Sequence, residues 1–84
     1  MVEKGNIIMM SVNSDEPEVY VVDERIDDMG HGESGWRCVE IDALSQKGAN
    51  NITPFDCWRI TDKYLETQIQ RGVIRIVEDI KYEN

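Results

Sequence analysis

The 84-residue sequence predicts a mainly β domain, a small antiparallel barrel of about five strands with one short helix before the last strand. Short runs of β-branched and aromatic residues recur along the chain, and glycine, proline or acidic turn residues separate them. The connections leave almost no room for the crossovers of a parallel sheet. A chain of this length allows one domain, residues 1–84, with a core built from few side chains.

Two strands are expected near the N-terminus. Residues 5–12, GNIIMMSV, form a compact apolar run that ends at a turn-rich segment. Residues 18–27 alternate in polarity, which places Val22 and Ile26 on the same face of a long strand. The end of this second strand is expected to be largely solvated.

Two further segments are expected to be loops, with a third strand between them. Residues 28–35 contain three glycines and no periodic apolar pattern, so they are expected to form a flexible loop. Residues 35–42, GWRCVEID, alternate again as a strand. Residues 43–51, ALSQKGANN, are polar and typical of a turn.

Residues 53–60 allow two interpretations. Thr53 and Pro54 suit the cap and first position of a helix, with Asp56 three residues after the cap. The overlapping run FDCWRI is instead rich in strand formers. The sequence leaves the choice between strand and helix open.

A clearer helix precedes the final strand. Thr61 is suited to cap a helix over residues 62–71, and Gly72 is suited to end it. Residues 72–80 then alternate as the last strand. This layout resembles that of SH3-like barrels, whose last two strands are often joined by a short helix. An open antiparallel sheet packed on one helix is the alternative.

Charge is the strongest functional signal in the sequence. The formal net charge is −8, from 17 acidic and 9 basic residues, so phosphate backbones and anionic membranes should repel the chain. We therefore expect no direct binding to nucleic acid or membranes. The excess is concentrated in residues 15–33, which hold eight acidic residues and one arginine. The acidic residues are Asp15, Glu16, Glu18, Asp23, Glu24, Asp27, Asp28 and Glu33.

This acidic stretch is the candidate partner-binding surface. Dense negative charge speeds the encounter with a basic protein and selects against other partners. Simple solubility is the competing explanation for such a run of charges. The leading hypothesis is a non-enzymatic acidic module that docks on a basic host protein, such as a nucleic-acid-handling enzyme, as an inhibitor or a mimic of nucleic acid.

A very small, acidic chain without a catalytic motif also resembles, in general character, the accessory proteins of large tailed bacteriophages. Many of those proteins bind and redirect a host protein. The resemblance covers the whole chain and implies a partner from the host.

The segments GWRCVEID and FDCWRITD raise a second hypothesis, because they hold every tryptophan and cysteine of the chain. Indole faces stack on nucleotide bases and guanidinium groups bind phosphate, so the two Trp-Arg pairs could form a small-ligand or nucleotide site. Because one small barrel offers little cavity, such a site is expected between the protomers of a homo-oligomer. The competing expectation is that both tryptophans fill the core. A structural role in a larger particle is a third alternative. The candidate ligand-binding residues are His31, Trp36, Arg37, Trp58 and Arg59.

Enzymatic activity is not predicted, since no nucleophile, base and orienting group come together in a local motif. No metal site or cofactor is predicted either, because Cys38, Cys57 and His31 lack ligand spacing and phosphate-loop and dinucleotide patterns are absent. No signal sequence or membrane span is apparent, so a cytoplasmic location is expected. Both cysteines are then expected to be reduced unless their strands are adjacent.

Overall fold

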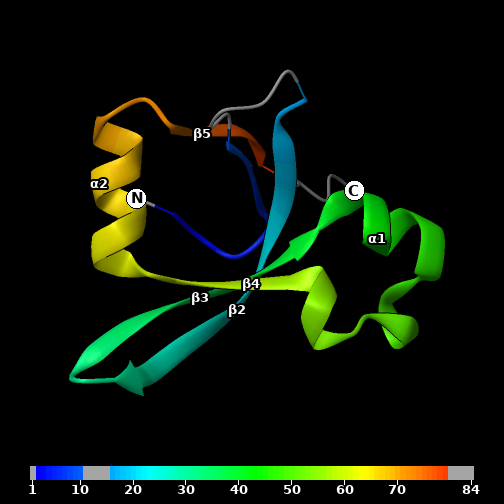
Figure 1. The fold of residues 1–84 in the computed structure, drawn as a ribbon, viewed down its shortest axis with the longest axis horizontal. Coiled ribbons are helices and arrows are strands. Elements are labelled where there is room, and N and C mark those ends of the chain that lie inside the picture. The colour runs from blue at the N-terminus through cyan, green and yellow to red at the C-terminus, as the bar shows by residue number, and fades with distance from the viewer. Residues whose placement is uncertain (1, 11–15, 80–84) are drawn as a thin grey trace, which may run out of the picture.

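Five antiparallel strands form one sheet in the order β4-β3-β2-β1-β5 (Figure 1). The computed structural model describes residues 2–10 and 16–79. The elements are β1 (Asn6–Met10), β2 (Glu18–Gly30), β3 (Glu33–Glu40), α1 (Ile41–Lys47), the short 3-10 helices η1 (Ala49–Asn51) and η2 (Pro54–Asp56), β4 (Cys57–Thr61), α2 (Asp62–Gln70) and β5 (Ile74–Asp79).

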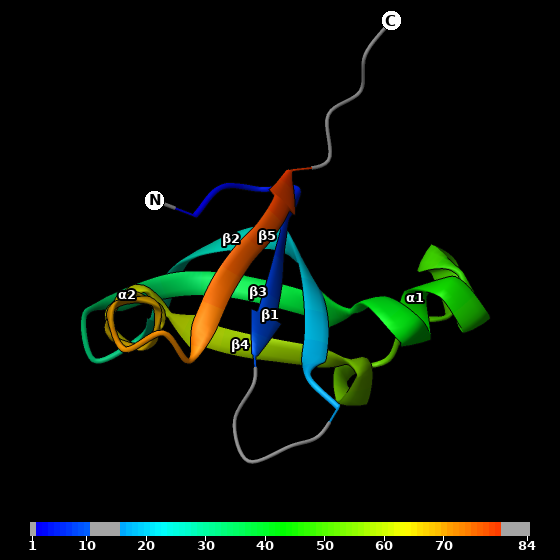
Figure 2. The same ribbon diagram turned by 90° about the horizontal axis from the view of Figure 1, so that it is seen from above.

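The sheet is strongly curled. In Figure 2, β1 and β5 cross β3 and β4 at a steep angle, as expected when a twisted sheet of few strands wraps around one core. Helix α2 lies before the last strand and contacts β3, β4 and β5. The predicted mainly β class, with antiparallel strands and a helix before the last one, is confirmed, and the architecture is consistent with a small barrel-like fold.

The two loop predictions, for residues 28–35 and 43–51, are wrong over most of their length. Residues 28–35 belong largely to β2 and β3, which continue to a tight turn at His31 and Gly32. Both turn residues have positive φ, 56° at His31 and 74° at Gly32, and such turns match the twist of a two-stranded hairpin. Residues 43–51 fall in α1 and η1, and α1 contacts β2 and β3.

The ambiguous segment 53–60 contains both predicted structures in succession. Thr53 and Asp56 form a reciprocal capping box around η2, and β4 starts directly afterwards at Cys57. The helix start at Thr61 is confirmed, because the Thr61 hydroxyl accepts a hydrogen bond from the Tyr64 amide at 3.2 Å. Helix α2 ends one residue earlier than predicted.

The core lies inside the curl of the sheet and is closed by α2. Its buried members come from every strand, from α2 and from Val2 ahead of β1. Both tryptophans are partly buried and pack against this cluster, in agreement with the expectation that they serve the core first. The buried members are Val2, Ile8, Val22, Cys38, Ile60, Leu65 and Ile74.

A bulge in β2 changes which face its later residues occupy. Val22 pairs with Cys38 and Glu24 with Arg37, so Asp23 is an extra residue in the ladder. Alternation is therefore shifted by one position beyond the bulge. Ile26 pairs with Gly35 and lines the outer face, whereas the unbroken pattern had placed it on the same face as Val22.

Gly35 permits the close approach of β3 to β4. A Cβ at this buried position would collide with the carbonyl oxygen of Ile60 and lie 2.5 Å from Sδ of Met29. Because backbone cannot move away cheaply, we predict that Gly35→Ala lowers the free energy of unfolding by about 1–3 kcal/mol.

Urea denaturation measures this effect through the transition midpoint. Gln46→Ala, at an exposed position of α1, is the control and is expected to change stability by less than about 0.5 kcal/mol. An unchanged midpoint for Gly35→Ala would contradict the close packing of β3 on β4.

Candidate functional site

The acidic stretch does not form one patch on the folded chain. Glu18 and Asp28 stand ten residues apart on β2, which corresponds to about 33 Å along a straight strand. Asp23 and Glu24 lie between them and contact Arg37. Asp15 lies outside the described residues. The carboxylates are thus divided among the start of β2 with Glu16 just before it, the middle of β2, and the far end of the β2–β3 hairpin, where Glu33 begins β3.

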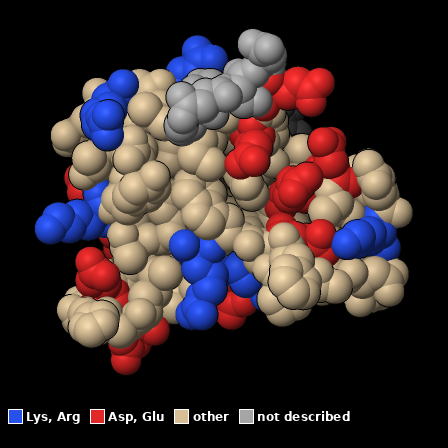
Figure 3. All heavy atoms as spheres, in the orientation of Figure 1, with Lys and Arg blue, Asp and Glu red and all other residues tan. Residues whose placement is uncertain are grey.

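The far end is a two-stranded projection, which we call the arm (residues 25–36). Figure 1 shows it extending beyond the rest of the sheet, on the same side of the molecule as α2. Asp27, Asp28 and Glu33 are exposed on it, and His31 is exposed in its turn. Among the described residues, no ion pair involves any of these three carboxylates. In Figure 3 acidic side chains gather at this end of the molecule, at the lower left.

The base of the arm is fixed to α2. The Arg25 guanidinium donates two hydrogen bonds to the Asp62 carboxylate, at 2.6 and 2.7 Å, and Ser34 Oγ donates to the same carboxylate at 2.8 Å. The guanidinium also lies 5.1 Å from the ring centre of Trp36. Two parallel hydrogen bonds fix orientation as well as distance, so the arm has a defined direction.

These hydrogen bonds also lower the pKa of Asp62, with Arg25 the main cause and Ser34 a smaller one. A carboxyl whose pKa is lowered by folding stabilises the fold above its unfolded pKa. That stabilisation is lost as pH falls through the folded pKa. The anchoring of the arm is therefore complete at neutral pH and weakens in acid.

Strand alternation separates the tryptophans from the arginines. Trp36 and Trp58 point to the core face of β3 and β4, while Arg37 and Arg59 point to the outer face. The Trp58 ring lies 5.3 Å from the ring of Tyr20 within the packed side. The structure thus does not bring the five candidate ligand residues together, and His31 lies apart from them in the turn of the arm.

The arginines instead line a cleft of about 890 Å³ on the outer face, which we call the arginine cleft. It extends from the arm past the middle of β3 and β4 to the η2 turn. Figure 3 shows a basic group over the middle strands, between acidic side chains. Its principal charged and polar lining residues are Glu24, Asp27, Asp28, Arg37, Thr53 and Arg59.

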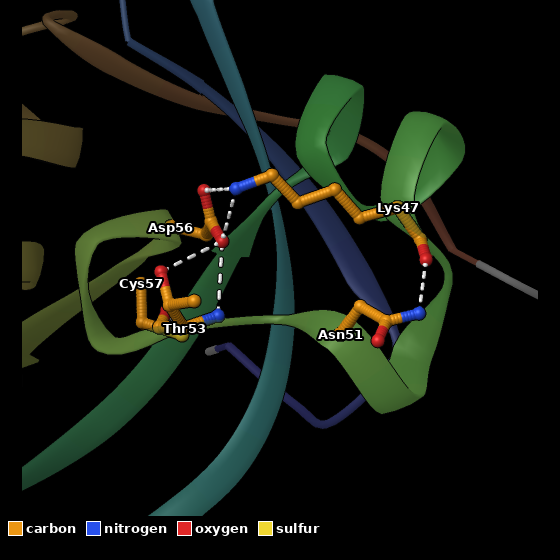
Figure 4. Close-up of polar contacts among 5 residues, drawn as sticks. All are labelled: Lys47, Asn51, Thr53, Asp56 and Cys57. Carbon is orange, nitrogen blue, oxygen red and sulfur yellow. Dashed lines mark hydrogen bonds and ion pairs between the residues drawn. The ribbon is translucent and has the colours of Figure 1, made fainter.

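The η2 turn at the end of the cleft presents Phe55, whose side chain is 98% exposed. The turn itself is braced, as Figure 4 shows. The Lys47 ammonium donates to both Asp56 oxygens at 3.0 Å, and the amide and hydroxyl of Thr53 donate to Asp56 Oδ2 at 2.9 and 3.0 Å. The Thr53 and Lys47 bonds lower the pKa of Asp56. A fully exposed phenyl ring is thus held on an ordered turn.

The sequence indicates the cap of this turn but not its exposed aromatic residue. The run TPFD indicated a helix start, and a phenylalanine next to apolar strand residues resembles a core position. No periodic signal distinguishes the two, because η2 contains only three residues. The ion pair of Lys47 with Asp56, nine residues further along the chain, instead braces the turn that carries Phe55.

The two cysteines lie on adjacent strands but on opposite faces of the sheet. Cys38 pairs with Trp58 and Cys57 with Val39, and both thiols are free. Burial, with a smaller contribution from Asp23, raises the pKa of the Cys38 thiol to about 12. Cys57 is half-buried and lines the arginine cleft. Because the thiolate is the reactive form, the two thiols should differ in reactivity.

We predict that one thiol per folded chain reacts rapidly with a thiol-specific reagent at pH 8, and that two react after unfolding. Absorbance of the released chromophore measures both numbers. The Cys57→Ser variant should lose the rapid reaction, and its remaining thiol, the buried Cys38, should react slowly until the protein is unfolded. Equal rates for both cysteines in the folded protein would contradict the burial of Cys38.

Comparison with protein-family models, curated proteins and solved structures gives no match. Within residues 2–10 and 16–79, no three histidine, cysteine or acidic side chains are grouped so that they could hold a metal ion. Across those same ranges, neither α-helix is long and apolar enough to cross a membrane. The geometry of the surface is therefore the basis for any functional proposal.

Proposed function

We propose that the protein is a non-enzymatic binding module that docks on a basic protein through the carboxylates at the end of the arm. The observation that carries this proposal is the placement of Asp27, Asp28 and Glu33. They are exposed together on a projecting hairpin, and no ion pair within the described residues neutralises them. By contrast, the inner carboxylates of Asp23, Asp56 and Asp62 face a basic group.

The arm suits this role because its base is ordered and its end is charged. A pre-oriented group loses little freedom on binding, so more of its interaction energy contributes to affinity. Charge at the end of a projection also raises the rate of encounter with an oppositely charged surface. If the basic surface of the partner normally binds nucleic acid, the module competes with nucleic acid for it.

Phe55 supports a macromolecular partner rather than a small ion. Aromatic side chains are enriched at protein interfaces, and an exposed one that is already held in place adds apolar contact at little entropic cost. The resemblance to small acidic accessory proteins of tailed bacteriophages is compatible with such docking and stays a prediction.

The first test neutralises the end of the arm with Asp27→Asn, Asp28→Asn and Glu33→Gln together. We expect this variant to lose the basic protein that the wild-type protein recovers from a host lysate at low salt. Raising the salt concentration should weaken recovery by the wild type, because exposed charges are screened. Quantitative mass spectrometry of the recovered proteins measures the loss.

The matched control removes the same number of charges elsewhere, with Glu3→Gln, Glu40→Gln and Glu66→Gln, which are all exposed. This control should recover the partner as the wild type does. Equal loss in both variants would show that only net charge matters, and undiminished recovery by the arm variant would overturn the proposal.

A second test addresses Phe55. Phe55→Ser should leave the free energy of unfolding within about 0.5 kcal/mol of wild type, because the ring is 98% exposed. Affinity for the recovered partner should fall about tenfold. Val77→Ser, at an exposed position of β5, is the control. Titration calorimetry with the purified partner distinguishes the two variants, and unchanged affinity of Phe55→Ser would remove the turn from the interface.

A further inference from the structure

Two arginines face each other across the ladder between β3 and β4. Arg37 pairs directly with Arg59, and both side chains line the arginine cleft. Like charges in directly opposite positions destabilise a sheet unless other charges compensate. Arg59 is exposed, and within the described residues no carboxylate forms an ion pair with it. Positive charge at the β4 side of the cleft is therefore left unbalanced.

Arg37 is paired but still accessible. Its guanidinium lies 3.1 Å from Asp23 and 3.9 Å from Glu24, and its side chain is 40% exposed. Its Nε is buried, so a ligand in the cleft can meet only the exposed part of the guanidinium. With the unpaired Arg59 directly opposite, the cleft presents guanidinium surface to an acidic group.

The group that best complements these guanidiniums is an oxyanion, since guanidinium groups pair most strongly with carboxylate and phosphate. The rest of the cleft decides between them. Glu24, Asp27 and Asp28 line it together with Arg25, Arg37 and Arg59, and Arg25 is already paired with Asp62, so the lining carries no net positive charge. A polyanionic backbone gains no net attraction there. A single carboxylate on a segment that also carries positive charge complements both parts of the cleft.

We propose that the arginine cleft binds an extended segment of the basic partner, whose Asp or Glu carboxylate lies between Arg37 and Arg59. A Lys or Arg of the same segment then faces Asp27 and Asp28. Glu24 pairs with Arg37 across the ladder, so it marks the level of the ligand's carboxylate along β2. Asp28 stands four residues further, about 13 Å along the strand. The two opposite charges of the ligand are therefore expected about four residues apart. This inference rests on the proposed function in that it takes the partner to be a basic protein.

The test uses two synthetic octapeptides, each with two lysines near one end. The first carries a glutamate four positions after the second lysine, and the other carries glutamine at that place. The ¹⁵N-labelled protein is titrated with each, and the Nε–Hε resonances of Arg37 and Arg59 are followed. We expect both resonances to shift with the glutamate peptide, and the glutamine peptide to bind about tenfold more weakly.

Variants locate the effect. Arg59→Gln should bind the glutamate peptide about tenfold more weakly than wild type and no longer distinguish it from the glutamine peptide. Arg71→Gln, at an exposed position after α2, is the matched control and should behave as wild type. Because Arg59 is exposed, its replacement is not expected to prevent folding.

The inference is overturned if the two peptides bind equally, or if neither shifts the arginine resonances at millimolar concentrations. Partner recovery that still depends on Asp27, Asp28 and Glu33 would then leave the proposed function standing. The opposite outcome is also distinguishable. If the wild-type protein discriminates between the peptides but the arm variant still recovers the partner, the proposed function is overturned and the cleft remains a carboxylate site.

Discussion

The period-two alternation of β3 and β4 is the constraint on which the rest of the structure depends. A small domain has few large apolar residues, so Trp36 and Trp58 must help to fill the core. Neighbours in a strand point to opposite faces, and the arginine after each tryptophan is therefore placed outside. The register of β3 and β4 then sets Arg37 directly opposite Arg59. Core packing on one face thus creates the charged cleft on the other.

The bulge at Asp23 extends this constraint to β2. It shifts the alternation, so that Glu24 joins the outer face while Arg25 turns to the side of Trp36 and reaches Asp62. One inserted residue therefore both supplies acidic side chains to the cleft and anchors the arm. A carboxylate-rich arm, an arginine pair and the η2 turn that carries Phe55 consequently border one cleft, and we propose that a partner contacts them together.

Much of the fold could be predicted from local pattern, because β1, β5 and α2 each carry a complete signal in their own residues. The helix start at Thr61 and the core role of the tryptophans are examples. The long hairpin was missed because the glycines of residues 28–35 indicated a loop. Gly30 ends β2 and Gly32 lies in the turn, and this hairpin forms through the pairing of β2 with β3 rather than through apolar content. The division of the acidic stretch and the cleft itself depend on the bulge and on register, which only the folded chain defines.

The most direct test of this account is a map of amide chemical shifts of the ¹⁵N-labelled protein on binding its purified partner. The account predicts perturbations confined to one face: the arm, Arg37 and Arg59 with their neighbours, and the η2 turn around Phe55. Perturbations centred instead on the outer surface of α2 or on β5, with the arm and cleft unaffected, would contradict it. Either result reports on binding by the whole, unmodified chain.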